Sequence, residues 1–268
     1  MPELAGMPDL ARLEHELRAL GPVVVAFSGG ADSAFLASVA TATLGADSVH
    51  CVTAVSSSLA SSERADCAAL ASEWGLRWTE VETDELSHDE YVANDGDRCF
   101  WCKTSLMDAL EPIASGENAT VVLGVNVDDL GDHRPGQRAA AQRGARFPLV
   151  DAGFTKDDVR AASRALGLRT WDKPAAACLA SRVPYGTQVT IGVLGQVERA
   201  EAGLRALGFP ELRVRHYDKV ARIELPLDAL ARAVDQRLAI VDAVKAAGYT
   251  WVTLDLEGLR SGNLNKLL

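Results

Sequence analysis

The chain has 268 residues, enough for one large domain or for two of modest size. Apolar residues make up 48% of the sequence, which supplies a packed core and excludes global disorder. The formal charge of −10 argues against a broad nucleic-acid surface, because phosphate contacts need a basic face. No run approaches the roughly 18 apolar residues that cross a bilayer.

The N-terminal region predicts a strand followed by a helix. Residues 1–20 carry charges throughout, lack the apolar segment of a secretory signal and predict a short amphipathic helix, so we expect a soluble, cytoplasmic protein. Residues 22–27 form a β-branched apolar run that is typical of a buried parallel strand. Residues 31–44, rich in small side chains, predict the helix that follows.

Three more strands are expected over residues 48–55, 77–81 and 119–125, with a helix over 61–74. Strands that alternate with helices predict a parallel sheet covered on both faces. Ligands of such sheets lie at the carboxyl ends of the strands, so the glycines after the first and fourth strands point at one site. We expect this α/β domain to span residues 1–184.

Beyond about Pro184 the pattern changes to that of a small α+β domain, which we expect over residues 185–268. Alternation of apolar and polar side chains predicts a hairpin with one wet face. The expected elements are two helices, the two hairpin strands and a last strand, over residues 188–207, 229–247, 212–216, 221–225 and 250–254.

The junction of the first strand and the following helix reads Ser28-Gly29-Gly30-Ala31-Asp32-Ser33. Glycines let a backbone approach an anion closely, and a helix start presents unpaired N–H groups and a partial positive charge to phosphate. Ser28 and Ser33 add hydroxyl donors, and Asp32 suits a Mg²⁺ ion that bridges phosphates.

This loop lacks the Walker lysine and is not a G-x-G-x-x-G turn. The plain alternative is a tight Gly-Gly turn with a Ser/Asp helix cap. Placed after a buried strand, however, the hexapeptide resembles the PP-loop of ATP pyrophosphatases, whose members release pyrophosphate and adenylate an oxygen. We therefore expect ATP to bind here, with Gly29 and Gly30 against its phosphates.

Five cysteines, an odd number, make a poor disulfide framework. Cys99 and Cys102 form a C-x-x-C, which alone is compatible with zinc, a redox pair, cluster ligands or two buried thiols. Cys178 lies near Arg182, and a thiolate stabilised by a cation is a nucleophile; a small buried side chain is the alternative. Core packing is expected for the two cysteines that fall within a strand and a helix, Cys51 and Cys67.

Nearly from end to end, the chain resembles the LarE family of PP-loop enzymes, which insert sulfur during synthesis of the nickel-pincer nucleotide cofactor of lactate racemase. The resemblance rests on motifs spread along the sequence. They are Ser28-Gly29-Gly30-Ala31-Asp32-Ser33, Arg98-Cys99-x-x-Cys102-Lys103, Gly124-x-Asn126-x-Asp128-Asp129-x-Gly131-Asp132-x-Arg134-Pro135-Gly136, Pro148-Leu149-Val150, Cys178-Leu179-Ala180-Ser181-Arg182-x-Pro184-Tyr185-Gly186, Arg213-Val214-Arg215-His216 and Glu257-Gly258-x-Arg260-Ser261-Gly262.

The resemblance implies that ATP, with Mg²⁺, adenylates a carboxylate of pyridinium-3,5-biscarboxylic acid mononucleotide, and that sulfur then displaces AMP to give a thiocarboxylate. Cys178 matches the family cysteine that attacks the acyl-adenylate. In some members this cysteine gives up its own sulfur and is left as dehydroalanine. Members with three cysteines bind a [4Fe–4S] cluster through all of them, and we favour this route because Cys99, Cys102 and Cys178 match that pattern.

Polar residues that follow the fourth strand lie where the ligands of the sheet are expected. Asp128, Asp129 and Asp132 suit Mg²⁺ or a ribose, and Arg134 suits an anion; a solvated acidic loop is the alternative. Lys103 is expected to contact phosphate, unless it is a plain surface lysine.

In the second domain, alternation puts Arg213 and Arg215 on one face of a strand, a good grip for phosphate. The resemblance implies that they hold the phosphate of the substrate and that Glu224 orients them; a salt-bridged exposed sheet face is the alternative. Arg182 is expected to bind an anion or to lower the pKa of the Cys178 thiol.

Two rival functions stay open. One is a PP-loop tRNA thiolase or amide-forming ligase, against which the acidic balance and the lack of a glutaminase or RNA-binding module count. The other is a non-enzymatic, nucleotide-binding iron–sulfur regulator, which would bind ATP without releasing pyrophosphate. The resemblance also implies a small-molecule nucleotide substrate and ring-like homo-oligomers such as hexamers, with no membrane partner.

Overall fold

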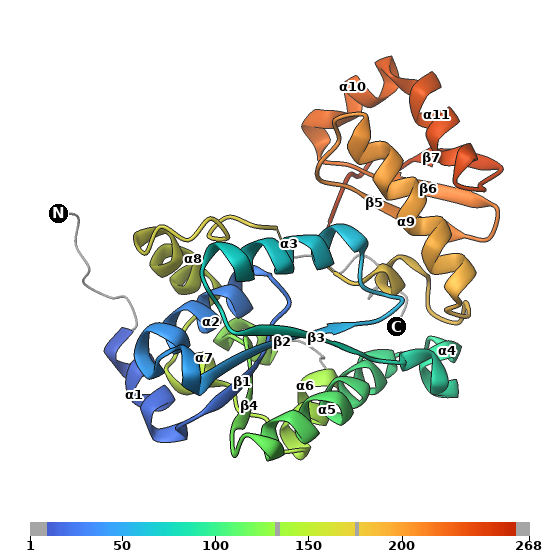
Figure 1. Ribbon diagram of the computed structural model, residues 1–268. Helices are drawn as coiled ribbons and strands as arrows, with labels where there is room; N and C mark the ends of the chain where they lie inside the picture. Colours follow the sequence, from blue (N-terminus) through green and yellow to red (C-terminus); the bar gives the residue numbers. More distant parts are fainter. Residues whose placement is uncertain (1–9, 132–134, 175–176, 261–268) are drawn as a thin grey trace. The chain divides into compact units, whose positions relative to one another are not determined.

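The computed structural model describes residues 10–131, 135–174 and 177–260 (Figure 1). These residues form two compact units, and neither is continuous in sequence. The first unit holds residues 10–56, 61–85, 99–131 and 135–174. The second holds residues 57–60, 86–98 and 177–260. Asp132 and Arg134, expected near the nucleotide, lie outside the described residues.

A four-stranded parallel sheet forms the centre of the first unit, in the order β3-β2-β1-β4. Its strands are β1 (Val23–Ala26), β2 (Val49–Val55), β3 (Trp78–Glu82) and β4 (Thr120–Leu123). β1 reads Val-Val-Val-Ala, and its three valines are fully buried, as the apolar run predicts for a central strand. The predicted α/β parallel sheet is confirmed.

Helices cover both faces of this sheet (Figure 1). Val23 and Val25 belong to one core with side chains of α1, α2 and α8, whereas Val24 belongs to a second core with α5 and α6, because successive residues of a strand face opposite ways. The helices are α1 (Leu10–Leu20), α2 (Ala31–Leu44), α3 (Ser61–Glu73), α5 (Arg98–Gly116), α6 (Pro135–Gln142), α7 (Pro148–Asp151) and α8 (Lys156–Ala165).

The second unit is the expected α+β fold. Its sheet has the order β5-β6-β7, in which β5 and β6 form the predicted antiparallel hairpin and β7 joins β6 in parallel. The strands are β5 (Arg213–Tyr217), β6 (Val220–Glu224) and β7 (Trp251–Leu254), and the helices are α4 (Asp89–Ala93), α9 (Ile191–Ala206), α10 (Leu230–Asp235) and α11 (Arg237–Ala246).

Two predicted helices of this unit differ from the structure. The helix expected over 229–247 is divided into α10 and α11, because Gln236 leaves the helical region with φ −92° and ψ 14°. The helix expected from residue 188 begins as α9 at Ile191, since the hydroxyl of Thr190 accepts a hydrogen bond from the Val193 N–H and caps it.

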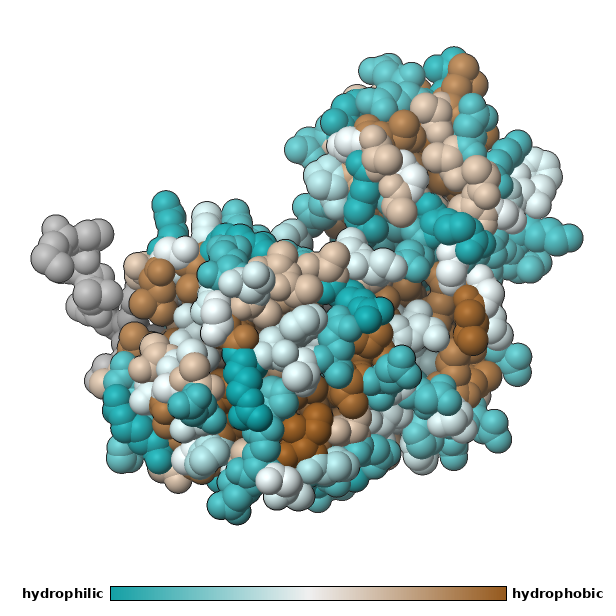
Figure 2. All heavy atoms as spheres, in the orientation of Figure 1, coloured by the Kyte–Doolittle hydropathy of each residue, from teal (hydrophilic) through white to brown (hydrophobic). Residues whose placement is uncertain are grey.

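Hydrophilic and apolar residues alternate over the visible face of each unit (Figure 2). The second unit exposes several large apolar side chains, among them Leu227, Leu238, Trp251 and Leu256. Within the described ranges, no helix has both the length and the apolar character that crossing a membrane requires.

Candidate active site

The loop between β1 and α2 is organised around the Ser33 hydroxyl. Ser33 is buried, and its Oγ accepts a hydrogen bond from the Ser28 N–H at 3.2 Å while donating to the Gly30 carbonyl at 3.2 Å. The Ser28 and Ser33 hydroxyls lie 3.0 Å apart and share a hydrogen bond. Ser33 therefore holds the loop in shape, and the more exposed Ser28 is the hydroxyl placed to meet a ligand.

Two glycines allow the close packing that this loop needs. Gly29 adopts φ +65°, and a Cβ there would lie 2.9 Å from the buried Sγ of Cys67. A Cβ on Gly124, at the end of β4, would lie 2.7 Å from the Ser33 nitrogen. The carboxyl end of β4 thus packs directly on the first turn of α2.

The start of α2 fits the phosphates of a nucleotide. Its N-cap is Gly30, which has no side chain to cap the helix, so the first N–H groups are available to an anion. These groups lie beyond the carboxyl end of β1, the edge at which open α/β sheets bind ligands.

Asp32 lies at this helix start beside a second acid. The Asn126 amide donates to Asp32 at 3.2 Å, and Asn126 and Asp129 are tied by reciprocal backbone-to-side-chain hydrogen bonds of 3.3 Å. Burial raises the pKa of Asp32, the Asn126 hydrogen bond opposes that shift, and the charge of Asp129 raises the pKa further. A divalent cation would relieve this repulsion, so the pair fits Mg²⁺.

Asp128, which was predicted to bind the nucleotide, has a different partner. Its carboxylate is exposed and accepts a hydrogen bond from the Lys156 N–H at 2.8 Å, at the start of α8. The contacts with Asp32 and Asn126 belong to its neighbour Asp129. Adjacent residues of a short 3₁₀ turn point in different directions, which the sequence pattern of two aspartates does not reveal.

The C-x-x-C lies on the first turn of α5. Cys99 is exposed and Cys102 is half-buried, and their spacing puts both thiols on one side of the helix. Gly136 of α6 packs on this turn, since a Cβ there would lie 2.7 Å from the Cys99 carbonyl and 2.7 Å from Cγ of Lys103. Lys103 itself is half-buried, one turn from Cys99.

Within the described ranges, no three His, Cys, Asp or Glu side chains form a group that could hold a metal ion. Cys99 and Cys102 belong to the first unit and Cys178 to the second, so the expected three-cysteine set stays a prediction. None of the five cysteines, all of them described, forms a disulfide. Cys51 and Cys67 are fully buried, as expected, and burial raises the pKa of Cys51 to about 12.

Cys178 belongs to the second unit, where it precedes a 3₁₀ turn, Leu179–Arg182. Its side chain is half-buried. Arg182 donates to the backbone carbonyls of Ala177 and Cys178, at 2.6 and 3.2 Å, and pairs with the buried carboxylate of Glu201 at 2.8 and 3.1 Å. Arg182 thus fixes the backbone that carries Cys178, and its contact with an anion or with the thiol stays a prediction.

The two arginines that were predicted to hold a phosphate lie on β5 of the β5–β6 hairpin. Arg215 is 2% exposed and donates to Glu224 at 2.9 Å and to the Ser181 carbonyl at 2.8 Å. Arg213 is only half-buried and donates to the Arg260 carbonyl at 3.1 Å. Burial, and then the charges of Arg215 and Arg182, lower the pKa of Arg213. An anion placed beside these neighbouring guanidinium groups would be bound favourably.

Three residues near these sites escaped prediction as functional side chains. Asn126 hydrogen-bonds to the acid Asp32, Glu201 pairs with Arg182, and Lys173 contacts the loop after β1. Asn126 stands in a recognised motif, and so could have been found. Glu201 and Lys173 carry no local pattern, because their partners are distant in sequence.

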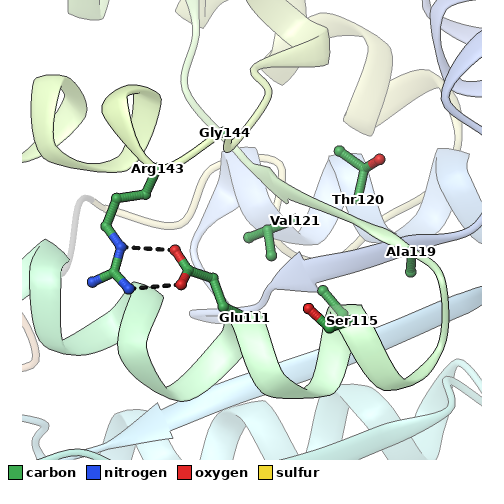
Figure 3. A pocket seen from close by; sticks show the side chains of 8 residues that line it. Glu111, Ser115, Ala119, Thr120, Val121, Arg143 and Gly144 are labelled. Atoms are coloured by element: carbon green, nitrogen blue, oxygen red, sulfur yellow. Dashed lines mark hydrogen bonds and ion pairs between the residues drawn. The ribbon is translucent and has the colours of Figure 1, made fainter.

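The pocket drawn in Figure 3 lies elsewhere in the first unit. It measures about 230 Å³ and is lined by the first residues of β4, Thr120 and Val121, and by Arg143, whose guanidinium pairs with Glu111 (Figure 3). This is the amino end of β4, whereas the PP-loop follows the carboxyl end of β1 in the same parallel sheet. The pocket therefore has no part in the site.

Comparison with known proteins agrees with these features. The NAD synthase family model matches residues 12–94. An uncharacterised protein of Synechocystis is 44% identical over 97% of both chains. The pyridinium-3,5-bisthiocarboxylic acid mononucleotide synthase of Lactiplantibacillus plantarum is 39% identical over 96% of this chain and 94% of its own. An uncharacterised protein of Methanocaldococcus jannaschii is 28% identical over 71% of this chain.

The likeness to the Lactiplantibacillus synthase runs through both units, and the PP-loop lies within the segment that the NAD synthase family matches. The chain belongs to the LarE family of PP-loop enzymes, the ATP-dependent sulfurtransferases that release AMP and pyrophosphate.

Proposed function

We propose that this enzyme uses ATP to activate a carboxylate of pyridinium-3,5-biscarboxylic acid mononucleotide and then replaces the activated oxygen with sulfur. The observation that carries the proposal is the loop of Ser28 to Ser33, whose open helix start suits the phosphates of ATP. The substrate is taken from the printed name of the Lactiplantibacillus relative, and the cationic hairpin supports a ligand that carries a phosphate.

The proposed chemistry is a pair of substitutions without net oxidation. A carboxylate oxygen of the substrate attacks the α-phosphorus of ATP, the bond to the β-phosphate oxygen breaks, and pyrophosphate leaves. A sulfur nucleophile then attacks the acyl-adenylate, and AMP leaves with the electron pair of the C–O bond. Activation is needed because a carboxylate oxygen is a poor leaving group. Where the nucleophile is the Cys178 thiolate, a thioester forms first; loss of the Cα proton and cleavage of the Cβ–S bond then release the thiocarboxylate and leave dehydroalanine.

Mg²⁺ is proposed to bind at Asp32, with Asp129 as the second acid. When bound, the ion would neutralise phosphate charge and stabilise the leaving pyrophosphate. Ser28 and the N–H groups at Gly30 and Asp32 would hold the phosphates, and Lys103 would add a cation from α5. In the second unit, Arg213 and Arg215, oriented by Glu224, would bind the phosphate of the substrate.

The acid assignment is tested by pyrophosphate release in the presence of the substrate. Asp32→Asn is expected to reduce release at least tenfold, and Asp129→Asn to reduce it severalfold. Asp128→Asn should leave it within about twofold, because that carboxylate is held at the start of α8. A loss in Asp128→Asn as large as in Asp32→Asn would return Asp128 to the site. Wild-type protein that binds ATP without releasing pyrophosphate would favour the regulator instead.

Sulfur is proposed to come through a [4Fe–4S] cluster held by Cys99, Cys102 and Cys178. The support is the three-cysteine pattern and the shared side of α5 on which the first two thiols lie. A cluster with three protein ligands keeps one iron open, which could carry the donated sulfide. The rival is Cys178 as a single-use donor that ends as dehydroalanine.

The two routes are separated by iron and sulfide analysis after anaerobic purification and reconstitution. The cluster route predicts about four irons per chain in the wild type and their loss in Cys99→Ala, with many turnovers per chain. The single-use route predicts no cluster, one product per chain and a mass loss of about 34 Da, since Cys178 loses its sulfur together with the thiol and Cα hydrogens on becoming dehydroalanine. Cys51→Ala, at a buried cysteine, serves as the matched control.

We further propose that residues 1–184 carry ATP activation and that residues 185–268 bind the substrate and contribute to homo-oligomers such as hexamers. Exposed apolar side chains of the second unit, such as Leu238 and Trp251, support an interface between copies. A cytoplasmic location and the absence of membrane partners complete the proposal.

A further inference from the structure

Lys173 reaches the phosphate-binding loop from a segment far along the chain. Its Nζ donates to the carbonyl of Gly29 at 3.0 Å. The same ammonium contacts Asp66 at 2.6 Å and Glu63 at 2.9 Å, two acids on consecutive turns of α3. Only 17% of the Lys173 side chain is exposed. Three oxygens therefore surround a cation that lies directly behind the loop.

The surrounding acids keep this cation charged and in place. Burial alone would lower the pKa of Lys173, but hydrogen bonds to Asp66 and Glu63 outweigh burial and raise it. Asp66 also accepts from Arg169 at 2.8 Å, and Arg169 pairs in turn with Glu73 at 2.8 Å. Arg169 thereby fixes the carboxylate of Asp66 on α3, and Asp66 in turn holds the ammonium of Lys173 near Gly29.

The contact sets the direction of one peptide group. A trans peptide is planar, so its carbonyl and its N–H point in opposite directions. Because the Gly29 carbonyl points toward Lys173, the N–H of Gly30 points the other way, at the N-cap of α2. Reversal of this peptide changes ψ of Gly29 and φ of Gly30, and Gly30, at φ −75°, can adopt positive φ at little cost because it is a glycine. A reversed Gly29–Gly30 peptide would present a carbonyl oxygen to the anion and repel it.

We propose that Lys173 is a positioning residue that locks the Gly29–Gly30 peptide, so that this loop presents N–H groups to the β- and γ-phosphates of ATP. The role rests on the proposed function, and it adds a residue that acts through the backbone of the loop without touching the nucleotide. The lock acts on polyphosphate ligands. It leaves the binding of adenosine and its 5′-monophosphate largely unaffected, since these ligands lack the β- and γ-phosphates that the Gly30 N–H would meet.

The test compares Lys173→Met with Arg169→Met as the matched control. Both changes remove a cation that pairs with Asp66, but only Lys173 contacts Gly29. Affinities for ATP, inorganic pyrophosphate and AMP are measured by titration calorimetry with Mg²⁺. Lys173→Met is expected to weaken ATP and pyrophosphate about tenfold or more and AMP less than about threefold. Arg169→Met should stay within about threefold for all ligands, and Lys173→Arg should recover most of the ATP affinity.

Equal losses for ATP, pyrophosphate and AMP in Lys173→Met would overturn the lock and assign Lys173 to general stability. Unchanged ATP affinity would overturn it as well. Should Lys173→Met fail to fold, the double variant Lys173→Met/Asp66→Asn removes the charge of one of the two acids that lose Lys173, and it permits the same comparison. Wild-type protein that binds neither ATP nor pyrophosphate would instead overturn the proposed function itself.

Discussion

Gly29 illustrates how a single missing Cβ shapes the nucleotide loop. Replacement by alanine would impose strain at φ +65° and bring the new Cβ within 2.9 Å of Sγ of Cys67. Strain at positive φ costs about 1–2 kcal/mol, and the clash adds to it by displacing the loop. We expect Gly29→Ala to lower the free energy of unfolding and to abolish detectable ATP binding in calorimetry.

Gly75 supplies the matched control, because its φ is +61° and a Cβ there meets open space within the described part of the chain. Gly75→Ala should pay the strain alone and keep ATP binding. Cys67→Ala removes the clashing sulfur, so the double variant Gly29→Ala/Cys67→Ala should recover part of the lost stability. A double variant no better than Gly29→Ala would show that φ, and not Cys67, excludes a side chain here.

Asp66 makes the fold sensitive to acid. Burial alone would raise the pKa of Asp66, but hydrogen bonds from Lys173 and Arg169 lower it below the usual range. A carboxyl with a lower pKa in the folded state stabilises the fold above its unfolded pKa, and that stability is lost as pH falls through the folded pKa. We therefore expect the free energy of unfolding to fall below about pH 4, the usual range of aspartate.

Denaturant titrations between about pH 2.5 and 6 measure this dependence. Asp66→Asn should be less stable than the wild type at pH 6, and the difference should narrow as the pH falls. Glu80, which lies on β3 and pairs with Arg64 at an exposed surface, is the control. Glu80→Gln should change the loss of unfolding free energy at low pH only slightly. An Asp66→Asn curve parallel to that of the wild type would contradict the pKa shift.

The contacts of individual side chains could be predicted from the sequence only in part. The motif after β4 drew attention to two adjacent aspartates, but which of them lies near Asp32 depends on a 3₁₀ turn. Arg182 was expected to bind an anion or to lower the pKa of the Cys178 thiol, and this role stays a prediction. Its pairing with Glu201 depends on the packing of α9 against the turn that carries it, which local sequence does not encode.

At the scale of elements, α6 is predicted to hold the C-x-x-C turn of α5 through Gly136. A Cβ at Gly136 would meet the Cys99 carbonyl and Cγ of Lys103, both at 2.7 Å. Overpacking of this kind costs about 1–3 kcal/mol and would push α6 from α5. We expect Gly136→Ala to lower the melting temperature and to reduce iron bound after reconstitution more than ATP binding.

Gly116, at the far end of α5, is the control, because a Cβ there meets no described atom within 4 Å. Gly116→Ala should leave iron content unchanged and stability equal or higher, since alanine favours helix by up to about 1 kcal/mol. Iron content that is the same in Gly136→Ala as in the wild type would show that the α5–α6 contact does not support the cysteine pair.

Elements were predicted well where periodicity is strong. The run of valines in β1 specifies burial on both faces of the sheet. Alternation correctly predicted the two hairpin strands, but the expected wet face was wrong, because Arg215 and Glu224 pair with each other and are buried. The break between α10 and α11 was missed, because the apolar spacing continues across Gln236 and neither glycine nor proline marks the junction. The strand order β3-β2-β1-β4 depends on contacts between distant segments and could not be read locally.

At the scale of the whole molecule, the second unit includes residues 57–60 and 86–98 in addition to its C-terminal part. These segments come from within the sequence of the first unit. Asn94 shows why they belong there: its amide donates to the carbonyls of Pro184 and Thr187, both at 2.8 Å. Composition changes near Pro184, but no change in composition marks residues 86–98. Composition alone therefore predicts a single domain boundary in the chain.

The overall charge of the protein favours a small nucleotide substrate over tRNA. With 27 basic against 37 acidic side chains, the formal charge of −10 opposes the approach of a polyanion. Two arginines of the β5–β6 hairpin, Arg215 and Arg222, pair with Glu224, and Arg182 pairs with Glu201, which leaves charge for one phosphate and not for a backbone of many. We therefore expect no retention of tRNA on filters at about 50 mM salt, where phosphate contacts are strongest.

The same filters can be run at rising salt, with ATP binding measured in parallel to confirm that the protein is active. Binding through many phosphates would appear as an affinity that falls steeply and linearly in a log–log plot against salt. Such a slope, together with pyrophosphate release stimulated by tRNA, would make the chain a tRNA thiolase in spite of its acidity. If the protein binds ATP but retains no tRNA at any salt concentration, a small phosphorylated carboxylate is the substrate class that the charges can accommodate.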